Sequence, residues 1–582
     1  MRRWPARWPD LLWSLGIAVV VLGPMLIRRG YVLRGDMVFV PRMPWKDAWL
    51  GLDGSVGRAV PVDALVSVAT SVVPGDLLQK AILLAAFVIG GWSVSGLVAD
   101  APVVARLGAV TIYLWNPWVL ERLALGQWGF VLGYAFLPLV VRAAFMLRDD
   151  VRRGWAPTVL WLGASAICTP SSGLMAALTA TVIVLTRPKL VSVLVVLGAS
   201  LAVNLAWLAP SLLSPPASGA TGGQFAAFGA RAESAAGVVL SVLSLGGVWK
   251  ESIVPRERTD ALVVALSVVL TAIALAGLWR ARARGSGDLV RGLGIVAAIS
   301  VLLALVPTWG PTQSLFERGA ETFAALGILR DSQRYLAPAA LLLAVGLALA
   351  IEGVWLAAAA PRQSLKAVAV LLLLWPVLVL PSLSWGISGY YDPVDYPAEW
   401  GQVSKRLESL PSGTTVVLPW LGGYRGFPWN DRHASLDPAP RFFPGEVLID
   451  DRLLFRDRVL GSEDTKLRRV GAALEAADPG EALAAIGVSY VLVEKANGLG
   501  RDDVPAGEVL HDGTGLTLIR LDGGTAGTTG GGGLVEAPRP WRPGVLAADI
   551  LVVLLLVVAM ASTAARRVYS VRHIGERHRE GV

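Results

Sequence analysis

Repeated apolar runs, each about 20 residues long, constrain this chain more than any other feature of its sequence. A helix of that length crosses a hydrocarbon core about 30 Å thick, and we count about twelve such runs, three of them short. Charged residues make up only 16% of the chain and hydrophobic residues 54%, whereas about 25% of the residues in soluble domains are charged. We therefore predict an α-helical polytopic membrane protein with spans at 10–27, 77–98, 103–116, 129–147, 155–169, 172–186, 190–213, 261–279, 289–307, 336–356, 367–383 and 544–564.

The loops between these runs carry unequal positive charge. Lys and Arg are dense on the side of the N-terminus, with clusters that include Arg280, Arg282, Arg566 and Arg567. The positive-inside rule then predicts a multi-pass plasma-membrane protein with both termini cytoplasmic. The first run is of full length, which indicates an anchor rather than a removed signal peptide. The net charge of +8 is explained by this topology and by the anionic headgroups of the lipid bilayer, so we expect no nucleic-acid partner.

The distribution of apolar and polar segments predicts the domain organisation. Residues 1–383 form the membrane bundle, with a long first outer loop at 28–76, and 384–522 form a small extracytoplasmic α/β domain. In that domain, the segment 400–410 has helical spacing, the segment 465–486 is a second helical stretch interrupted by a proline, and TTVVLPW, SYVLVEK and LTLIRLD have strand composition. A Gly-rich linker at 523–543 leads to the last membrane helix and a basic cytoplasmic tail at 544–582.

Several common kinds of site are excluded by the motifs that the sequence lacks. There is no Walker motif, no GxGxxG after a strand, no HExxH and no GxSxG. All four His residues lie outside the predicted spans, and the single cysteine, Cys168, excludes both an internal disulfide and a Cys-based metal site. The remaining polar side chains on the outer face are carboxylates and arginines next to tryptophans.

The first outer loop contains the candidate catalytic carboxylates. Asp36, in the sequence RGDM, is the first choice, and the alternative is a loop cap or an ion pair with Arg34. Asp63, in VPVDAL, is the second choice, and its alternative is a role at a helix N-terminus. A carboxylate in this position can act as general base toward a sugar hydroxyl.

Arginines near the outer ends of the spans are candidates for holding a phosphate, because a guanidinium binds it bidentately. We nominate Arg122, Arg330 and Arg334, supported by Glu121 and Asp331; for each arginine the alternative is an interfacial anchor. Arg122 and Glu121 lie in WNPWVLERLALGQWG at 115–129, which we expect to be an outer connection with its tryptophans in the interfacial belt. Glu121 and Arg122 form either a simple ion pair or part of a polar cavity.

The predicted outer domain has an aromatic loop, PWLGGYRGFPWN, at 419–430. Trp420, Tyr424 and Trp429 are candidates for stacking against a sugar or guiding an acceptor. The alternative, which the sequence leaves open, is that these rings pack against the membrane bundle.

The bundle, the long first outer loop with its Asp, and the extracytoplasmic C-terminal domain together resemble the GT-C superfamily of polyprenyl-phosphate-sugar-dependent glycosyltransferases. The GDMVFVP loop and the WNPWVLERL segment are similar to actinobacterial membrane proteins of arabinofuranosyl- or mannosyltransferase type. The resemblance implies an inverting transfer from a polyprenyl-phosphate sugar to a cell-envelope glycan or glycolipid acceptor on the extracytoplasmic face, with Asp36 at the position of the family's general base. Many family members have a paired acidic motif at this place, whereas this chain has Gly35-Asp36-Met37 with a single acidic residue. The resemblance with this departure implies that no cofactor or bound metal is required. A divalent cation can still assist the phosphate.

Two other functions fit the same sequence. A lipid or glycan transporter or flippase would also be a helical bundle, but transporters place ionisable residues and broken helices near the bilayer midplane, and the predicted spans are almost free of charge at their centres. A non-catalytic membrane scaffold would have the same spans, with the outer domain binding partners.

Overall fold

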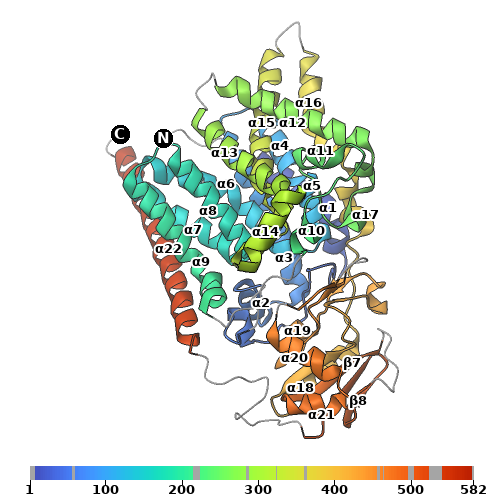
Figure 1. The fold of residues 1–582 in the computed structure, drawn as a ribbon. Coiled ribbons are helices and arrows are strands. Elements are labelled where there is room, and N and C mark those ends of the chain that lie inside the picture. Colours follow the sequence, from blue (N-terminus) through green and yellow to red (C-terminus); the bar gives the residue numbers. More distant parts are fainter. Residues whose placement is uncertain are drawn as a thin grey trace.

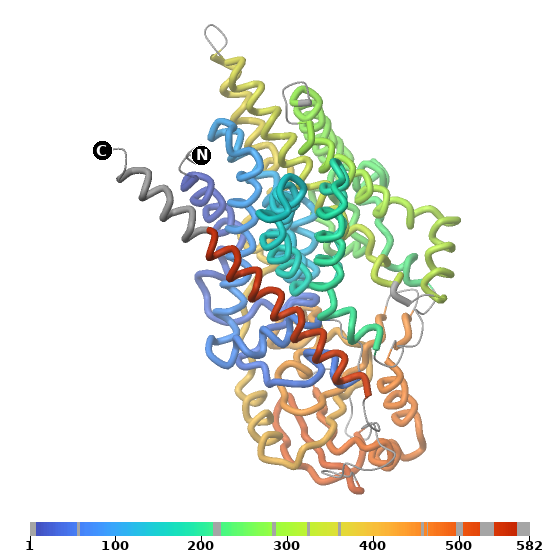
Figure 2. The backbone as a smooth tube through the Cα atoms, turned by 90° about the vertical axis from the view of Figure 1, so that its left-hand side faces the viewer, coloured from blue at the N-terminus to red at the C-terminus, as the bar shows by residue number. Residues whose placement is uncertain are grey.

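A computed structural model describes residues 7–54, 59–213, 223–282, 287–322, 324–358, 363–454, 459–462, 464–495, 504–523 and 540–579 of the chain. A large bundle of helices occupies one end of the molecule, and a smaller part that contains a β-sheet occupies the other (Figure 1). The long helix α22 (Arg542–Arg579) starts near the sheet and runs back along α7 and α9 to the far end of the bundle, close to the start of α1 (Figures 1 and 2). The chain is therefore a polytopic helical membrane protein with a small α/β part.

All twelve predicted spans lie in helices. Within the described ranges, nine helical segments are long and apolar enough to cross a membrane, or ten if the pair 365–379 and 381–389, bent by 70°, is one span. The runs predicted at 155–169 and 172–186 correspond to the 18-residue helix α7 and the 16-residue helix α8, which are not among the nine. The bundle helices are α1 (Trp8–Ile27), α3 (Gly75–Ser95), α4 (Val103–Leu114), α5 (Pro117–Ala124), α6 (Trp128–Asp149), α7 (Val151–Cys168), α8 (Pro170–Leu185), α9 (Leu190–Leu213), α12 (Ala261–Arg282), α13 (Gly287–Leu305), α15 (Ala337–Ala357), α16 (Leu365–Val379) and α22.

The segment expected to be an outer connection at 115–129 is instead largely helix α5, buried in the bundle. The chain breaks between α4 and α5, where the Asn116 Oδ1 accepts a hydrogen bond from the Val119 backbone N–H at 3.0 Å and caps the new helix ahead of Pro117. Trp115, Trp118 and Trp128 are buried rather than placed in an interfacial belt. Every residue of α5 is buried, so its polar side chains, Glu121 and Arg122, lie inside the bundle.

The first outer loop lies between the bundle and the sheet. It contains the short helices η1 (Asp47–Leu50) and α2 (Val62–Thr70), and its first part is extended. The buried side chain of Gln79 in α3 fixes this extended part by pairing with the backbone N–H and C=O of Val32, at 3.0 and 2.8 Å. Tyr31 pairs with Val394 through two backbone hydrogen bonds. The loop is therefore a packed layer rather than a free connection.

A five-stranded mixed sheet forms the core of the α/β part, in the order β4-β1-β7-β9-β8. β1 is parallel to β4 and β7, while β9 is antiparallel to β7 and β8. The three strands predicted from composition are β1, β7 and β9, and the predicted helical segments are α18, α20 and α21. The elements are α18 (Ala398–Glu408), β1 (Thr414–Leu418), β4 (Glu446–Leu448), α20 (Thr465–Leu474), α21 (Pro479–Ala485), β7 (Val488–Glu494), β8 (Glu508–Asp512) and β9 (Leu516–Arg520).

Two short hairpins extend from this sheet toward the bundle. They pair β2 (Tyr424–Arg425) with β3 (Ser435–Leu436), and β5 (Leu453–Leu454) with β6 (Val459–Leu460). The proposed domain boundaries and the side of the membrane on which each part lies stay predictions, and most of the Gly-rich linker predicted at 523–543 lies outside the described residues.

Candidate functional site

The Asp36 loop is pressed into the bundle. Every residue from 31 to 40 is buried except Asp36, which is half-buried. The Asp36 backbone N–H donates to the Leu125 carbonyl at 2.9 Å, in the turn between α5 and α6. Gly126 in this turn has a φ of +76°, and a Cβ there would lie 2.0 Å from the Arg34 carbonyl oxygen. Glycine is therefore required for the close approach of the two backbones, and the loop presents Asp36 as its one accessible side chain.

The α/β part supplies the other side of the site. The Tyr424 hydroxyl, on β2, donates a hydrogen bond to Asp36 Oδ1. Gly35 pairs with the same hairpin, because its N–H donates to the Ala434 carbonyl at 3.0 Å and its carbonyl accepts from the Leu436 N–H at 2.7 Å. The hairpin and the loop therefore hold Asp36 and Tyr424 in contact, although they are 388 positions apart in the sequence.

Asp36 makes no ion pair with any described residue. The proposed partner Arg34 points elsewhere: its Nε donates to the Tyr390 carbonyl at 2.7 Å, and its guanidinium lies 4.8 Å from the centre of the Tyr390 ring. The second hydrogen bond to Asp36 comes from the Gln127 amide, at 3.4 Å from Oδ2. A carboxylate held by neutral donors and unpaired with an arginine keeps an oxygen lone pair available for a proton.

Gln127 connects Asp36 to a buried ionic network around Arg122. Arg122 is fully buried, and its Nη1 donates to Gln127 Oε1 at 2.7 Å and to Asp331 Oδ2 at 2.9 Å. Its Nη2 donates to Gln333 Oε1. Burial tends to raise the pKa of Asp331, but Arg122 and Arg334 reverse this effect and hold that pKa below its ordinary value. The Arg122 guanidinium is thus enclosed by protein acceptors and acts on Asp36 through Gln127.

Glu121 joins the same network from the adjacent position of α5. The Gln333 amide donates to Glu121 Oε2 at 2.7 Å and to the Gly246 carbonyl at 3.3 Å. A second buried pair lies next to it, in which Arg258 Nε donates to Glu233 Oε2 at 2.8 Å. Glu121 and Arg122 bind the same Gln333 amide rather than each other, so the structure places them in a buried polar network and not in a simple ion pair.

The other two nominated arginines flank this network. Arg334 donates to Asp331 Oδ2 at 3.1 Å and to Ser171 Oγ at 3.3 Å, and 16% of its side chain is exposed. Arg330 donates to Gln224 Oε1 at 2.9 Å, and its guanidinium lies 5.3 Å from the centre of the Phe228 ring. Arg334 is therefore the nominated cation that is both joined to the Asp36 network and partly open.

Asp63 has a separate set of contacts. It is buried in the first turn of α2 and pairs with Arg441 of the α/β part at 2.8 Å. Burial raises the pKa of Asp63, and the nearby Arg441 guanidinium only partly offsets this rise. Its contacts make it a connection between the first outer loop and the α/β part rather than a neighbour of Asp36.

Of the three aromatic residues nominated for sugar stacking, Tyr424 alone contacts Asp36. Trp429 packs in a cluster with Tyr396, Trp400 and Phe427, with ring centres 4.9 to 5.8 Å apart. Trp420 is half-buried against the core under the sheet. Both tryptophans therefore pack inside the α/β part, which is neither a sugar-facing position nor the packing against the membrane bundle that the sequence left open.

Three functional side chains were missed by sequence reasoning. Gln127 and Gln333 join the charged residues to one another, and a lone glutamine carries no recognisable sequence signal. The third is Lys250, whose pKa is lowered by burial and raised in part by the negative charge of Asp36. Lys250 therefore lies within the electrostatic influence of Asp36, and its position beside Trp249 in an outer loop was the signal available.

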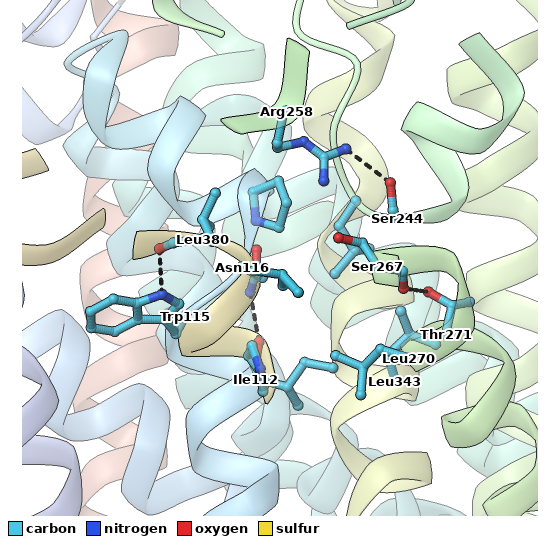
Figure 3. Close-up of a pocket in the computed structure, with 14 residues that line it drawn as sticks. Ile112, Trp115, Asn116, Ser244, Arg258, Ser267, Leu270, Thr271, Leu343 and Leu380 are labelled. Carbon is cyan, nitrogen blue, oxygen red and sulfur yellow. Dashed lines mark hydrogen bonds between the residues drawn. The ribbon is translucent and has the colours of Figure 1, made fainter. Parts of the chain in front are cut away.

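A pocket lies in the bundle apart from Asp36. It is a small pocket lined by residues of α4, α12, α15 and α16 and by Arg258 (Figure 3). Asn116 and Trp115 form one wall, where the Trp115 indole donates to the Leu380 carbonyl at 2.8 Å. In the part of the chain that the structure describes, no group of three or more His, Cys, Asp or Glu residues converges to hold a metal ion.

Fold and site together define a polytopic helical membrane protein with a small α/β part packed against its first outer loop. Among solved structures, the chain is similar to the arabinofuranosyltransferase AftD from Mycobacteria, with a TM-score of 0.55 and 16% identity over 89% of this chain and 40% of that one. A structure of a variant of that enzyme gives a TM-score of 0.52 and 15% identity, over 89% and 42%. No family model and no curated protein matches. The chain thus spans about two fifths of the length of AftD, and this likeness shows the fold.

Proposed function

We propose that this chain is a membrane glycosyltransferase that moves a sugar from a polyprenyl-phosphate donor to a cell-envelope glycan or glycolipid. The observation that carries the proposal is Asp36, a half-buried carboxylate with two neutral hydrogen-bond donors and, among the described residues, no ion pair. It lies where the first outer loop meets the bundle and the α/β part, in a fold similar to that of an arabinofuranosyltransferase. We propose Asp36 as the general base.

In this reaction the acceptor hydroxyl gives its proton to a carboxylate oxygen of Asp36 as its own oxygen attacks the anomeric carbon. The bond between that carbon and the phosphate oxygen breaks, and the electron pair stays with the departing polyprenyl phosphate. Attack from the face opposite the phosphate inverts the anomeric centre. Tyr424 and Gln127 orient the Asp36 carboxylate through their hydrogen bonds.

The departing phosphate gains negative charge, which nearby cations stabilise. Arg334 is the nominated arginine best suited to this role, because its guanidinium is partly exposed and is connected to Asp36 through Asp331 and Arg122. Arg122 itself is a positioning residue in this scheme. No resident cofactor takes part, and whether a divalent cation assists is decided by assays with EDTA and with added Mg²⁺ or Mn²⁺.

The proposed orientation places the α/β part on the extracytoplasmic face and both termini in the cytoplasm. The start of α1 lies at the end of the bundle opposite the sheet, and α22 runs toward that same end (Figure 2). Both findings agree with the distribution of Lys and Arg in the loops. A polyprenyl-phosphate donor and an envelope acceptor on the outer face are the partners that this orientation favours.

The test uses purified protein in nanodiscs with a panel of radiolabelled polyprenyl-phosphate sugars and an acceptor prepared from actinobacterial envelope. Asp36→Asn is the test variant, and Asp395→Asn, which changes an exposed carboxylate near the start of the α/β part, is the matched control. We expect label in product with wild type and with Asp395→Asn, and no product with Asp36→Asn at equal protein level. Transfer that survives Asp36→Asn would refute the role of Asp36, and no transfer from any donor by wild type would favour a transporter or a scaffold.

A further inference from the structure

The loop between α11 (Gly237–Leu243) and α12 passes directly over the ionic network. The Gly246 carbonyl accepts a hydrogen bond from the Gln333 amide at 3.3 Å, and the Gly247 carbonyl accepts one from the Arg231 N–H at 3.1 Å. Arg258, near the end of the loop, donates to Ser244 Oγ at 2.9 Å (Figure 3). The loop is therefore joined to the Arg122 network through Gln333, and its shape is held by the contacts with Arg231 and between Ser244 and Arg258.

Lys250 occupies the part of this loop that meets the α/β part. The neighbouring Trp249 packs edge-on against Phe228, with ring centres 4.8 Å apart, and the Arg330 guanidinium lies 5.3 Å from the centre of the same Phe228 ring. Leu453 and Leu460 of the β5–β6 hairpin complete this cluster from the other side. The cluster fixes the backbone of Lys250 at the junction of the two parts, beside Arg330.

The Lys250 ammonium has no hydrogen-bond or ion-pair partner among the residues that the structure describes, although the residue is half-buried. The negative charge of Asp36 partly offsets the lowering of the Lys250 pKa by burial. Three neighbouring arginines have accepting partners instead: Arg122 in the network, Arg258 with Glu233, and Arg34 with Tyr390. Lys250 is thus a half-buried cation at the junction of the bundle and the α/β part, without a structural contact among the described residues to satisfy it.

We propose that Lys250 binds the phosphate of the lipid donor and stabilises it as the sugar departs. This inference rests on the proposed glycosyl transfer, and it names the residue that would contact the leaving group. An ammonium is a compact charge with three donors that suits a phosphate in any orientation. The half-buried position strengthens its attraction for a phosphate relative to a fully solvated lysine.

The test measures the binding of radiolabelled polyprenyl phosphate, without a sugar, to the full-length protein in nanodiscs. Lys250→Met removes the charge and keeps a long apolar side chain, and Lys250→Arg restores the charge. Arg256→Met is the matched control, because it removes an exposed cation from the same loop. We expect Lys250→Met to weaken binding about 10- to 100-fold, as for loss of a hydrogen bond between two charged groups, with Lys250→Arg and Arg256→Met within a few fold of wild type.

The same variants are assayed for transfer, so that failure of this inference and failure of the proposed function are told apart. Transfer by wild type together with unchanged polyprenyl-phosphate binding by Lys250→Met would overturn the inference and leave the function standing. If Lys250→Met instead shifts only the pH dependence of transfer, Lys250 acts on Asp36 and not on the phosphate, which also overturns it. Absence of both transfer and polyprenyl-phosphate binding in wild type would overturn the proposed function itself.

Discussion

Replacing Arg122 with methionine distinguishes a buried positioning residue from a residue that holds the donor phosphate. The guanidinium is fully buried and donates to Gln127, Asp331 and Gln333. Methionine fills a similar volume but leaves these three acceptors without their donor. We therefore expect Arg122→Met to destabilise the folded protein and, because Gln127 loses its support, also to lower transfer.

The size of the effect follows from these contacts. Breaking a buried ion pair by removing one partner costs about 3–5 kcal/mol, because the remaining charge stays buried. Asp331 keeps its hydrogen bond from Arg334 at 3.1 Å, so we expect the lower end, about 3 kcal/mol. In the double variant with Asp331→Asn the stranded charge is absent, and the two changes should be coupled by about 1–3 kcal/mol.

The change also predicts a shift in pH dependence. In the wild type the pKa of Asp331 is below its ordinary value, so the stability it contributes is present at neutral pH and is lost as the pH falls through that lowered value. Removal of Arg122 raises the pKa of Asp331. The acid-induced loss of stability that Asp331 contributes should therefore be smaller in Arg122→Met than in the wild type, because its folded-state pKa moves toward the unfolded value.

Unfolding is measured by SDS titration in mixed micelles, followed by tryptophan fluorescence, from pH 4 to pH 8, alongside donor binding in nanodiscs. We expect a lower free energy of unfolding with little change in polyprenyl-phosphate affinity. Unchanged stability together with donor affinity reduced tenfold or more would refute this reasoning, since Arg122 would then be a phosphate ligand. Additive effects of Arg122→Met and Asp331→Asn would refute the ion pair.

Three further predictions concern the first outer loop and its contacts. Gly126→Ala should abolish transfer and destabilise the fold by about 1–3 kcal/mol, because its φ of +76° and the 2.0 Å approach to a backbone oxygen exclude a Cβ. Gly16→Ala is the control, because a Cβ there meets nothing within 4 Å. Equal thermal melting of the two variants would contradict the argument. Tyr424→Phe should reduce the transfer rate about tenfold by removing a hydrogen bond to the Asp36 carboxylate. Tyr490→Phe, which loses only a hydrogen bond to the Pro411 carbonyl inside the α/β part, should retain the wild-type rate. Equal transfer rates of the two variants would show that Tyr424 is dispensable. Burial lowers the pKa of Lys46 to about 7. Between that pH and about 10.5, the ordinary lysine value, the unfolded chain binds more protons than the folded chain, so stability rises with pH. Melting temperatures measured across this range should show that slope in wild type and not in Lys46→Met.

Local sequence information was sufficient for the apolar helices and for three of the five strands of the sheet, but not for β4, β8 or the two hairpins. The apolar runs became helices because a backbone in lipid must satisfy its hydrogen bonds internally. The strand segments at 414–420, 489–495 and 516–522 became β1, β7 and β9 because their β-branched residues pack on a buried sheet. The connection predicted at 115–129 contains the buried helix α5, since Asn116 and Pro117 begin a new helix as readily as they begin a loop.

The sequence nominated the charged residues of the candidate site and Tyr424, but not the glutamines that join them. Asp36, Arg122, Asp331 and Arg334 were nominated from residue type and position in outer loops, and the structure links them through a chain of hydrogen bonds. Asp63 was nominated by the same reasoning, yet it pairs with Arg441 away from that chain. Residue type indicates what a side chain can do, but not which side chain will be beside it.

The sequence by itself determined that this is a multi-span membrane protein with a small α/β part and a carboxylate in its first outer loop, because hydrophobic length and strand composition are properties of neighbouring residues. Tertiary structure alone decided that Arg122 is enclosed, that Tyr424 reaches Asp36, and that Lys250 lies within the electrostatic influence of the same carboxylate. These contacts join residues 91 to 388 positions apart, and they depend on how the helices, the loop and the β2–β3 hairpin pack. The chemistry of the site therefore arises from packing that no local segment encodes.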